Sequence, residues 1–193
     1  MKNEIIFVSG QRGSGKSFWV KKYLKGLPRF LLYDTLGEYE GTRQTDLAGV
    51  IQLCKDADKG FCDIIFDPLD DSLFSLFCRV ALAMKNIYII VEELDQFSTS
   101  FKTPIEFQKL IKYGRHYGIN LIGISRRPSE VSRLFTSQCT RFVIFNQREP
   151  RDVTYFRSII GEWAEHLPTL QDHSFIDIDF SKGTPSNPIC QPV

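Results

Sequence analysis

The segment Gly10-Gln-Arg-Gly-Ser-Gly-Lys-Ser17 matches the pattern G-x-x-x-x-G-K-[S/T] in full. Its glycines allow backbone N–H groups to curl around a phosphate chain, and the helix expected after Gly15 points its positive end at the same phosphates. In this pattern Lys16 would reach the β- and γ-phosphates, and the Ser17 hydroxyl would bind Mg²⁺. The segment therefore predicts a site for ATP and Mg²⁺. Its expected binding residues are Gly10, Gln11, Arg12, Gly13, Ser14, Gly15, Lys16, Ser17 and Phe18. Arg12 is not required by the pattern, and either a phosphate contact or a solvated side chain would suit it.

Two adjacent carboxylates, Glu92 and Glu93, follow the apolar run Ile87–Val91. Transfer of a phosphoryl group needs an acid near Mg²⁺ and a base that aligns the attacking water. Consecutive side chains of a strand point to opposite faces, so the two carboxylates can take different roles. We assign Glu92 to the metal and Glu93 to the general base, with Asp95 as a reserve candidate. The alternative is that these acids only cap the next helix.

Short apolar runs alternate with stretches of helical spacing along the chain. The apolar runs cover 5–8, 30–33, 64–66, 87–91, 119–124 and 141–145, and 175–180 alternates as an edge strand does. The helical stretches cover 16–26, 45–56, 70–84, 104–117, 129–137 and 150–166. This alternation predicts an α/β fold with a mostly parallel sheet and helices on both faces. Ligands of such sheets bind beyond the carboxyl ends of the strands, where both chemical segments fall.

Length and composition limit the possible functions. The chain has 193 residues, which suits one domain, and its 42% hydrophobic content is ordinary for a globular protein. We expect that domain to span 1–180 and residues 181–193, which include three prolines, to form an extended tail. The formal net charge of +1 means that contact with nucleic acid requires a local basic patch. No apolar run has the length of a membrane span. The five cysteines form no C-x-x-C pair, so we expect reduced thiols.

Four separated motifs give the sequence a family resemblance. Besides the phosphate loop, these are Tyr33-Asp-Thr-Leu-Gly-Glu-Tyr39, the block from Arg115 through Gly118 to Ile124-Ser-Arg-Arg-Pro128, and Glu149-Pro-Arg-Asp152. They resemble, in the right order, motifs of the FtsK–HerA superfamily of P-loop ATPases. The resemblance extends from Ile5 to about Leu170. It is greatest to the genome-packaging ATPases of tailless icosahedral double-stranded DNA viruses, because the short chain looks like a bare ATPase core.

The resemblance implies a RecA/ASCE-like P-loop NTPase and adds two arginines to the expected catalytic residues Lys16 and Glu93. Arg115 occupies the position of an arginine finger that acts on a neighbouring subunit, although an arginine at a helix end is also typical of stable helices. Arg126 stands at the sensor position, where the family usually has glutamine. A cation could still contact phosphate there, but it accepts no hydrogen bond.

The same resemblance implies an ATP-hydrolysing DNA translocase that packages viral double-stranded DNA into a preformed capsid. Its partners would be DNA of any sequence, other copies in a hexameric or pentameric ring, and capsid vertex proteins, without a membrane segment of its own. The expected location is the host cytoplasm, with association with the virion. Channel-lining candidates are Lys102, Lys109, Lys112, Arg126, Arg127 and Arg133.

Three other functions remain open from the sequence. One is a minimal HerA-like translocase with a non-viral role. Another is a nucleotide-gated assembly factor that never moves DNA, which DNA-stimulated turnover would distinguish. The third is a small-molecule kinase, against which the paired glutamates and the block from Arg115 to Pro128 argue.

Overall fold

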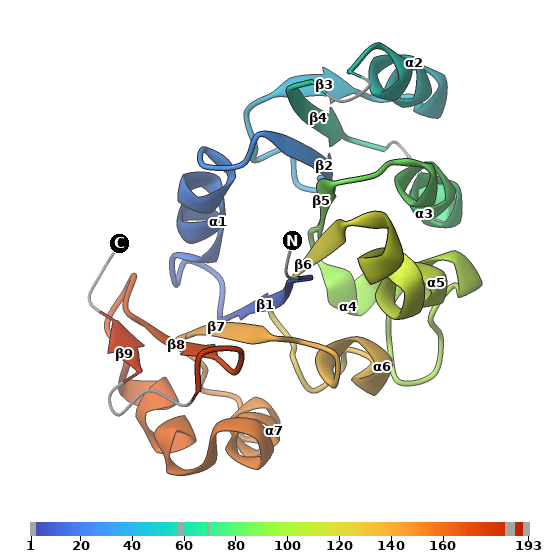
Figure 1. The fold of residues 1–193 in the computed structure, drawn as a ribbon. Helices are drawn as coiled ribbons and strands as arrows, with labels where there is room; N and C mark the ends of the chain where they lie inside the picture. The colour runs from blue at the N-terminus through green and yellow to red at the C-terminus, as the bar shows by residue number, and fades with distance from the viewer. Residues whose placement is uncertain (1–2, 58–59, 69, 184–187, 191–193) are drawn as a thin grey trace.

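The central sheet is built almost entirely from parallel strands (Figure 1). The computed structural model describes residues 3–57, 60–68, 70–183 and 188–190. Over these residues the strand order is β3-β4-β2-β5-β6-β1-β7-β8-β9, and only the pairs β7–β8 and β8–β9 are antiparallel. The strands are β1 (Ile5–Ser9), β2 (Arg29–Tyr33), β3 (Thr42–Gln44), β4 (Cys62–Phe66), β5 (Ile87–Val91), β6 (Ile119–Ser125), β7 (Arg141–Phe145), β8 (Phe175–Asp179) and β9 (Ile189–Cys190).

Helices cover both faces of this sheet, as expected from the sequence. The α-helices are α1 (Lys16–Leu24), α2 (Leu47–Ala57), α3 (Phe74–Ala83), α4 (Leu94–Phe97), α5 (Ile105–Tyr113), α6 (Arg133–Thr136) and α7 (Pro150–Ile160). The 3₁₀ segments are η1 (Asp71–Leu73), η2 (Gly114–Tyr117) and η3 (Gly161–Thr169). Helix α1 packs alone on one face, while α2, α3, α5, α6 and α7 contribute to the larger core on the other face (Figure 1).

The middle strands are buried on both sides because each lies between two helical layers. Every residue of β1, β2 and β6 is buried. In β1 the side chains of Ile6 and Val8 join the core under α1, whereas Ile5 and Phe7 join the core on the other face. This alternation explains why the sequence shows these strands as unbroken apolar runs. Strand β1 lies between β6 and β7, which places the phosphate loop at the middle of the sheet.

The α/β fold is confirmed, and all seven expected strands form. The sequence analysis did not predict α4, β3 and β9, because these elements are too short to show a hydrophobic period. The stretch 175–180 does not form the edge, because β9 pairs with the outer side of β8. Part of the expected tail is thus Ile189–Cys190 of β9, while 184–187 and 191–193 lie outside the described residues.

Several expected helices are shorter than their periodic pattern. The stretch 150–166 leaves α-helical geometry at Gly161, whose φ is 63°, and continues as η3. The stretch 129–137 narrows to α6, which Ser132 caps by accepting a hydrogen bond from Leu134 N–H. Within the described residues, no helix has the length and apolar character needed to cross a lipid bilayer.

Candidate active site

The phosphate loop joins the carboxyl end of β1 to the first turn of α1. Gly13 and Gly15 have φ values of 77° and 108°, a region that residues with a Cβ rarely adopt. A Cβ at Gly10 would come within 2.5 Å of the Phe145 Cβ, so β7 also requires glycine there. The loop is tethered to β7 by a 2.9 Å hydrogen bond from Gln11 N–H to the Asn146 carbonyl. The loop therefore takes a shape that its own glycines and the neighbouring strand impose.

Lys16 begins α1 and turns back over the phosphate loop. Its Nζ donates to the carbonyls of Gly10 and Gln11 at 2.7 and 2.8 Å. Burial lowers the pKa of Lys16, and the negative charges of Glu92 and Glu93 partly oppose this shift. A cation held there by weak carbonyl partners can exchange them for phosphate oxygens, which bind it more strongly. Lys16 therefore lies where a phosphate chain bound to the loop would meet it.

Glu92 and Glu93 are both buried directly after β5. Glu92 extends the strand, since its N–H donates to the Tyr33 carbonyl of β2 at 3.1 Å. Glu93 leaves the strand in a left-handed conformation, with φ and ψ both 47°, and precedes α4. Such strain in a non-glycine residue persists only where the surroundings enforce it, and it often accompanies function. The two carboxylates thus diverge through a backbone turn at Glu93, rather than through the strand alternation expected from the sequence.

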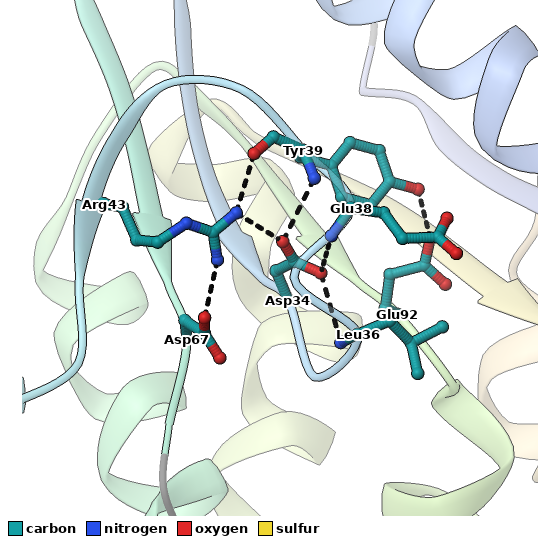
Figure 2. A network of polar contacts seen from close by, with 7 residues as sticks. All are labelled: Asp34, Leu36, Glu38, Tyr39, Arg43, Asp67 and Glu92. Carbon is teal, nitrogen blue, oxygen red and sulfur yellow. Dashed lines mark hydrogen bonds and ion pairs between the residues drawn. The ribbon is translucent and has the colours of Figure 1, made fainter.

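The carboxylate of Glu92 accepts a hydrogen bond from the hydroxyl of Tyr39, which belongs to the loop after β2 (Figure 2). Burial raises its pKa to about 7, while the hydrogen bond from the Tyr39 hydroxyl and the charge of Lys16 act in the opposite direction. The Ser17 side chain lies beside the Tyr39 hydroxyl, where hydrogen bonding to it opposes the rise that burial causes in the pKa of Tyr39. The two expected metal ligands therefore meet at one tyrosine. Their hydroxyl and carboxylate oxygens are the hard donors that Mg²⁺ prefers.

Arg126 forms an ion pair with Glu93 across the ends of β5 and β6. Its Nη2 lies 2.9 Å from one carboxylate oxygen, and its Nε donates to the other at 3.2 Å. The Arg126 side chain is 43% exposed, whereas Glu93 is buried. The residue at the expected sensor position therefore contacts the expected base directly. The sequence did not predict this pairing.

The loop that carries Arg126 is anchored by α7. Asp152 is fully buried and accepts hydrogen bonds from Ser129 N–H and its hydroxyl, at 3.1 and 2.6 Å. Arg127 lies 3.4 Å from the other Asp152 oxygen and 3.3 Å from Glu130. Asp152 ends the motif Glu149-Pro-Arg-Asp152, so this motif positions the neighbouring loop in the fold.

Arg115 lies at the amino ends of the parallel strands, whereas the phosphate loop lies at their carboxyl ends. It belongs to η2, just before β6, whereas Arg126 follows the end of β6. The seven residues of β6 place the two ends of the strand roughly 20 Å apart. Arg115 is exposed, and no described residue forms an ion pair with it. It therefore cannot act on the nucleotide site of its own chain.

Two other expected binding residues lie beside the phosphate loop. Phe18 is 50% exposed, and its ring contacts that of His173 edge-on at 5.6 Å. His173 also donates its N–H to the Ser14 carbonyl at 3.1 Å and contacts Gly15. Arg12 is exposed and lines a pocket of about 410 Å³ with Arg126, Arg127 and Arg148 among others. Asp95 is half-buried, and its Oδ1 has no hydrogen-bond partner among the described residues.

Sequence reasoning missed four residues around this site. These are Tyr39 and Asp152, which the sequence analysis names only as the last residues of motifs, and Arg43 and His173, which it does not name. Their partners are distant in the chain; Tyr39 and Glu92, for example, are 53 residues apart. Only the Asp34-to-Tyr39 and Glu149-to-Asp152 motifs gave a signal, and that signal did not indicate contacts.

Comparison with solved structures defines the fold more closely. The genome-packaging NTPase B204 of Sulfolobus turreted icosahedral virus 2, in complex with AMPPCP, has a TM-score of 0.78 to this chain. The two are 22% identical, and the match covers 100% of each chain. B204 of Sulfolobus turreted icosahedral virus, described as its DNA-packaging ATPase, gives 0.77 at 20% identity and the same coverage. The chain has the fold of a viral genome-packaging NTPase. The P-loop NTPase fold and the resemblance to packaging ATPases are thereby confirmed at the level of the fold.

Two further comparisons add context. Protein P9 of Pseudoalteromonas phage PM2 is 28% identical over 140 residues, which cover 68% of this chain and 63% of that protein. The match therefore spans less than two thirds of the length of P9. ATPases 2 and 3 of EccC from Thermomonospora curvata, in complex with a signal sequence peptide, give a TM-score of 0.64 at 12% identity, covering 97% of this chain and 37% of theirs. No protein-family model matches the chain.

Proposed function

We propose that this protein hydrolyses ATP and uses the energy to package viral double-stranded DNA into a preformed capsid. The observation that carries the proposal is the meeting of the phosphate loop with the buried pair Glu92–Glu93, in a chain that matches viral packaging NTPases over its whole length. One such neighbour was solved with ATP-γ-S and matches 98% of each chain at a TM-score of 0.79 and 20% identity. The proposed setting is the host cytoplasm and the virion.

Each group of the site has a task in this reaction. Lys16 would bind the phosphates in place of its present carbonyl partners. Ser17 and Glu92 would hold Mg²⁺, which would neutralise charge on the β- and γ-phosphates. Glu93 would accept a proton from the attacking water. Because Arg126 engages both oxygens of Glu93, the base must lose at least one of these bonds before it can act.

The γ-phosphate of ATP is the natural competitor for Arg126. A guanidinium binds phosphate and carboxylate oxygens in the same bidentate way. The exposed side chain of Arg126 leaves it free to turn from Glu93 toward a bound anion. Binding of ATP would therefore release the base at the moment when it is needed.

Completion of the site requires a second copy of the chain. Arg115 would enter the site of a neighbouring subunit and neutralise charge on the γ-phosphate, an effect worth about 10³–10⁵ in rate in related systems. Head-to-tail contacts of this kind close into rings. The ring would be a hexamer or a pentamer, attached to capsid vertex proteins.

The face of α5 offers the best contact for DNA. Lys102, Lys109 and Lys112 are exposed on or beside this helix, and none has an ion-pair partner among the described residues. The other channel candidates are occupied: Arg126 pairs with Glu93, Arg127 with Glu130 and Asp152, and Arg133 stacks on Tyr155 at 4.4 Å. The three lysines are thus free to bind phosphates of any DNA sequence.

The first experiment measures phosphate release from ATP with and without linear double-stranded DNA, at low and moderate salt. We expect hydrolysis that DNA stimulates several-fold and that weakens as salt rises, because phosphate contacts release counterions. Glu93→Gln should bind ATP without turning it over, and Lys16→Ala should lose binding or turnover. Hydrolysis indifferent to DNA would contradict translocation and favour a nucleotide-gated assembly factor. Absence of any hydrolysis would contradict the whole proposal.

Two sets of variants separate the ring from the DNA contact. Subunits with Arg115→Ala, mixed with Glu93→Gln subunits, should regain activity, because each supplies the group that the other lacks. No recovery in verified mixed oligomers would count against a finger acting between subunits. Replacement of Lys102, Lys109 and Lys112 by alanine should remove DNA stimulation and keep basal hydrolysis. The exposed lysines Lys22, in α1, and Lys25, directly after it, provide the matched control.

A further inference from the structure

Tyr39 connects the two residues expected to hold Mg²⁺. Its side chain is buried, at 4% exposure, between α1 and the end of β5. The hydroxyl donates a hydrogen bond to Glu92 Oε1 (Figure 2). The Ser17 side chain lies near enough to this hydroxyl to oppose the rise that burial causes in the pKa of Tyr39. The Nζ of Lys21, one turn along α1 from Ser17, lies 5.7 Å from the centre of the Tyr39 ring. The ring is therefore held on the α1 side as well as by its hydroxyl.

The backbone of Tyr39 is fixed by the buried carboxylate of Asp34. Asp34 is fully buried and accepts hydrogen bonds from the N–H groups of Leu36, Glu38 and Tyr39 at 3.2–3.3 Å. These bonds close the loop that follows β2, and Gly37 makes the turn with a φ of 68°. The position of the Tyr39 backbone is thus set from within its own loop.

Arg43 of β3 holds the same loop from outside (Figure 2). Its Nη2 bonds both Asp34, at 3.0 Å, and the Tyr39 carbonyl, at 2.7 Å. Its Nη1 pairs with Asp67, beyond the end of β4, at 2.8 Å. Tyr39 is therefore held at its N–H, its carbonyl, its ring and its hydroxyl. We name Asp34, Arg43 and Asp67 the β2-loop clamp.

A carboxylate at the end of a buried strand has several rotamers, and only some of them face the metal ligands of α1. Glu92 also lies near Lys16, which attracts it electrostatically toward the phosphate loop. A hydrogen-bond donor whose position is fixed can hold the Glu92 side chain in one rotamer despite the attraction of Lys16. The Tyr39 hydroxyl is such a donor, because the β2-loop clamp removes its freedom to follow the carboxylate.

We propose that Tyr39 is a positioning residue for Mg²⁺, which holds Glu92 and Ser17 at the spacing that the metal requires. The inference rests on the proposed ATP site and assigns a task to the loop of the motif Tyr33-Asp-Thr-Leu-Gly-Glu-Tyr39. Tyr39 itself need not touch the metal or the nucleotide. Its effect is carried by the orientation of its two partners.

The test measures binding of a non-hydrolysable ATP analogue by calorimetry, with Mg²⁺ and with EDTA, for the wild type and Tyr39→Phe. Loss of the hydroxyl should leave affinity in EDTA nearly unchanged and reduce the Mg²⁺-dependent gain in affinity about tenfold or more. An equal loss under both conditions would show a purely structural role and overturn the proposal. An unchanged or larger gain with Mg²⁺ would overturn it too, since Tyr39 would then be irrelevant to the metal or compete with it.

Tyr33→Phe is the matched control. Tyr33 is also fully buried and ends β2, yet its hydroxyl has no hydrogen-bond partner among the described residues. Its removal should change neither affinity. Arg43→Lys is a second, indirect variant, because a lysine cannot reproduce the two-pronged contact of arginine. It should reduce the same Mg²⁺-dependent gain by a smaller factor, and no reduction would contradict the role of the clamp.

The binding measurement separates this inference from the proposed function. An analogue that cannot be hydrolysed reports on the metal site even if the wild type neither turns over ATP nor responds to DNA. If the wild type binds the analogue equally in Mg²⁺ and EDTA, the positioning role is refuted directly. Hydrolysis by the wild type, measured separately, decides the proposed function.

Discussion

The two carboxylates of the site are held by different kinds of surroundings. Glu92 is fixed by Tyr39 and, behind it, by the β2-loop clamp with its fully buried Asp34. Glu93 is held by Arg126, whose side chain is 43% exposed. The loop that carries Arg126 is hydrogen-bonded to Asp152 through Ser129. The side of Glu92, our proposed metal side, is therefore fixed by buried contacts within the protein, whereas the side of Glu93, our proposed base side, can rearrange. A site that first binds ATP and then hydrolyses it, as we propose, needs both a fixed part and a part that can rearrange.

The largest expected effect tests the rigidity of the metal side. Asp34→Asn leaves Arg43 without its fully buried partner and should lower the free energy of unfolding by about 3–5 kcal/mol. Asp152→Asn, the corresponding change on the base side, should cost only about 1–3 kcal/mol, because its ion pair with Arg127 is longer, at 3.4 Å against 3.0 Å, and Arg127 is more exposed than Arg43. Urea unfolding measures both. Equal losses would remove the distinction between the two sides.

The second test uses pH in the absence of Mg²⁺. Burial raises the pKa of Glu92 from its ordinary 4.5 to about 7. The folded state therefore binds more protons than the unfolded state between these values, and Glu92 makes folding less favourable as pH rises through this window. Glu92→Gln should raise the free energy of unfolding by about 1–3 kcal/mol at pH 8 and hardly at all near pH 4.5.

Glu93→Gln provides the control for this measurement. It removes the partner of Arg126 and should not stabilise the protein at pH 8. Thermal or urea unfolding in EDTA measures the change in the free energy of unfolding for both variants, each at pH 5 and at pH 8. A gain from Glu92→Gln that is independent of pH would show that ionisation of Glu92 is not its cause.

The smallest effect is expected on the base side. Arg126→Ala should lower the free energy of unfolding by about 1 kcal/mol, because loss of the 43% exposed arginine removes the partner of Glu93 but also admits water to its carboxylate. The change should shrink further in high salt. A loss comparable to that of Asp34→Asn would mean that the base side is as rigid as the metal side.

The parts of this molecule that sequence reasoning predicted are those with local causes. Gly13, Gly15 and Lys16 lie within one short segment, and the apolar runs of the central strands reflect burial on both faces. These features need only neighbours in the chain. The position of Glu92 and Glu93 after a buried strand is local in the same sense.

The contacts that give the site its character could not be predicted, because they join distant segments. Arg126 meets Glu93 only because β5 and β6 are adjacent, and Tyr39 meets Glu92 only because β2 lies on the other side of β5. The motif from Tyr33 to Tyr39 indicated that this segment has a function, but it did not indicate that Tyr39 contacts Glu92. Strand β3, which carries Arg43, has three residues and no period to detect.

The position of β1 has a consequence for the order in which the chain can fold. Its partners on either side are β6 and β7, so one edge stays unpaired until about residue 125 has left the ribosome and the other until about residue 145. The phosphate loop also depends on Phe145, Asn146 and His173 for its shape. A nascent chain therefore carries the complete nucleotide-binding segment long before it can bind a nucleotide. During synthesis, β1 is an exposed apolar segment that must be kept from pairing with another chain.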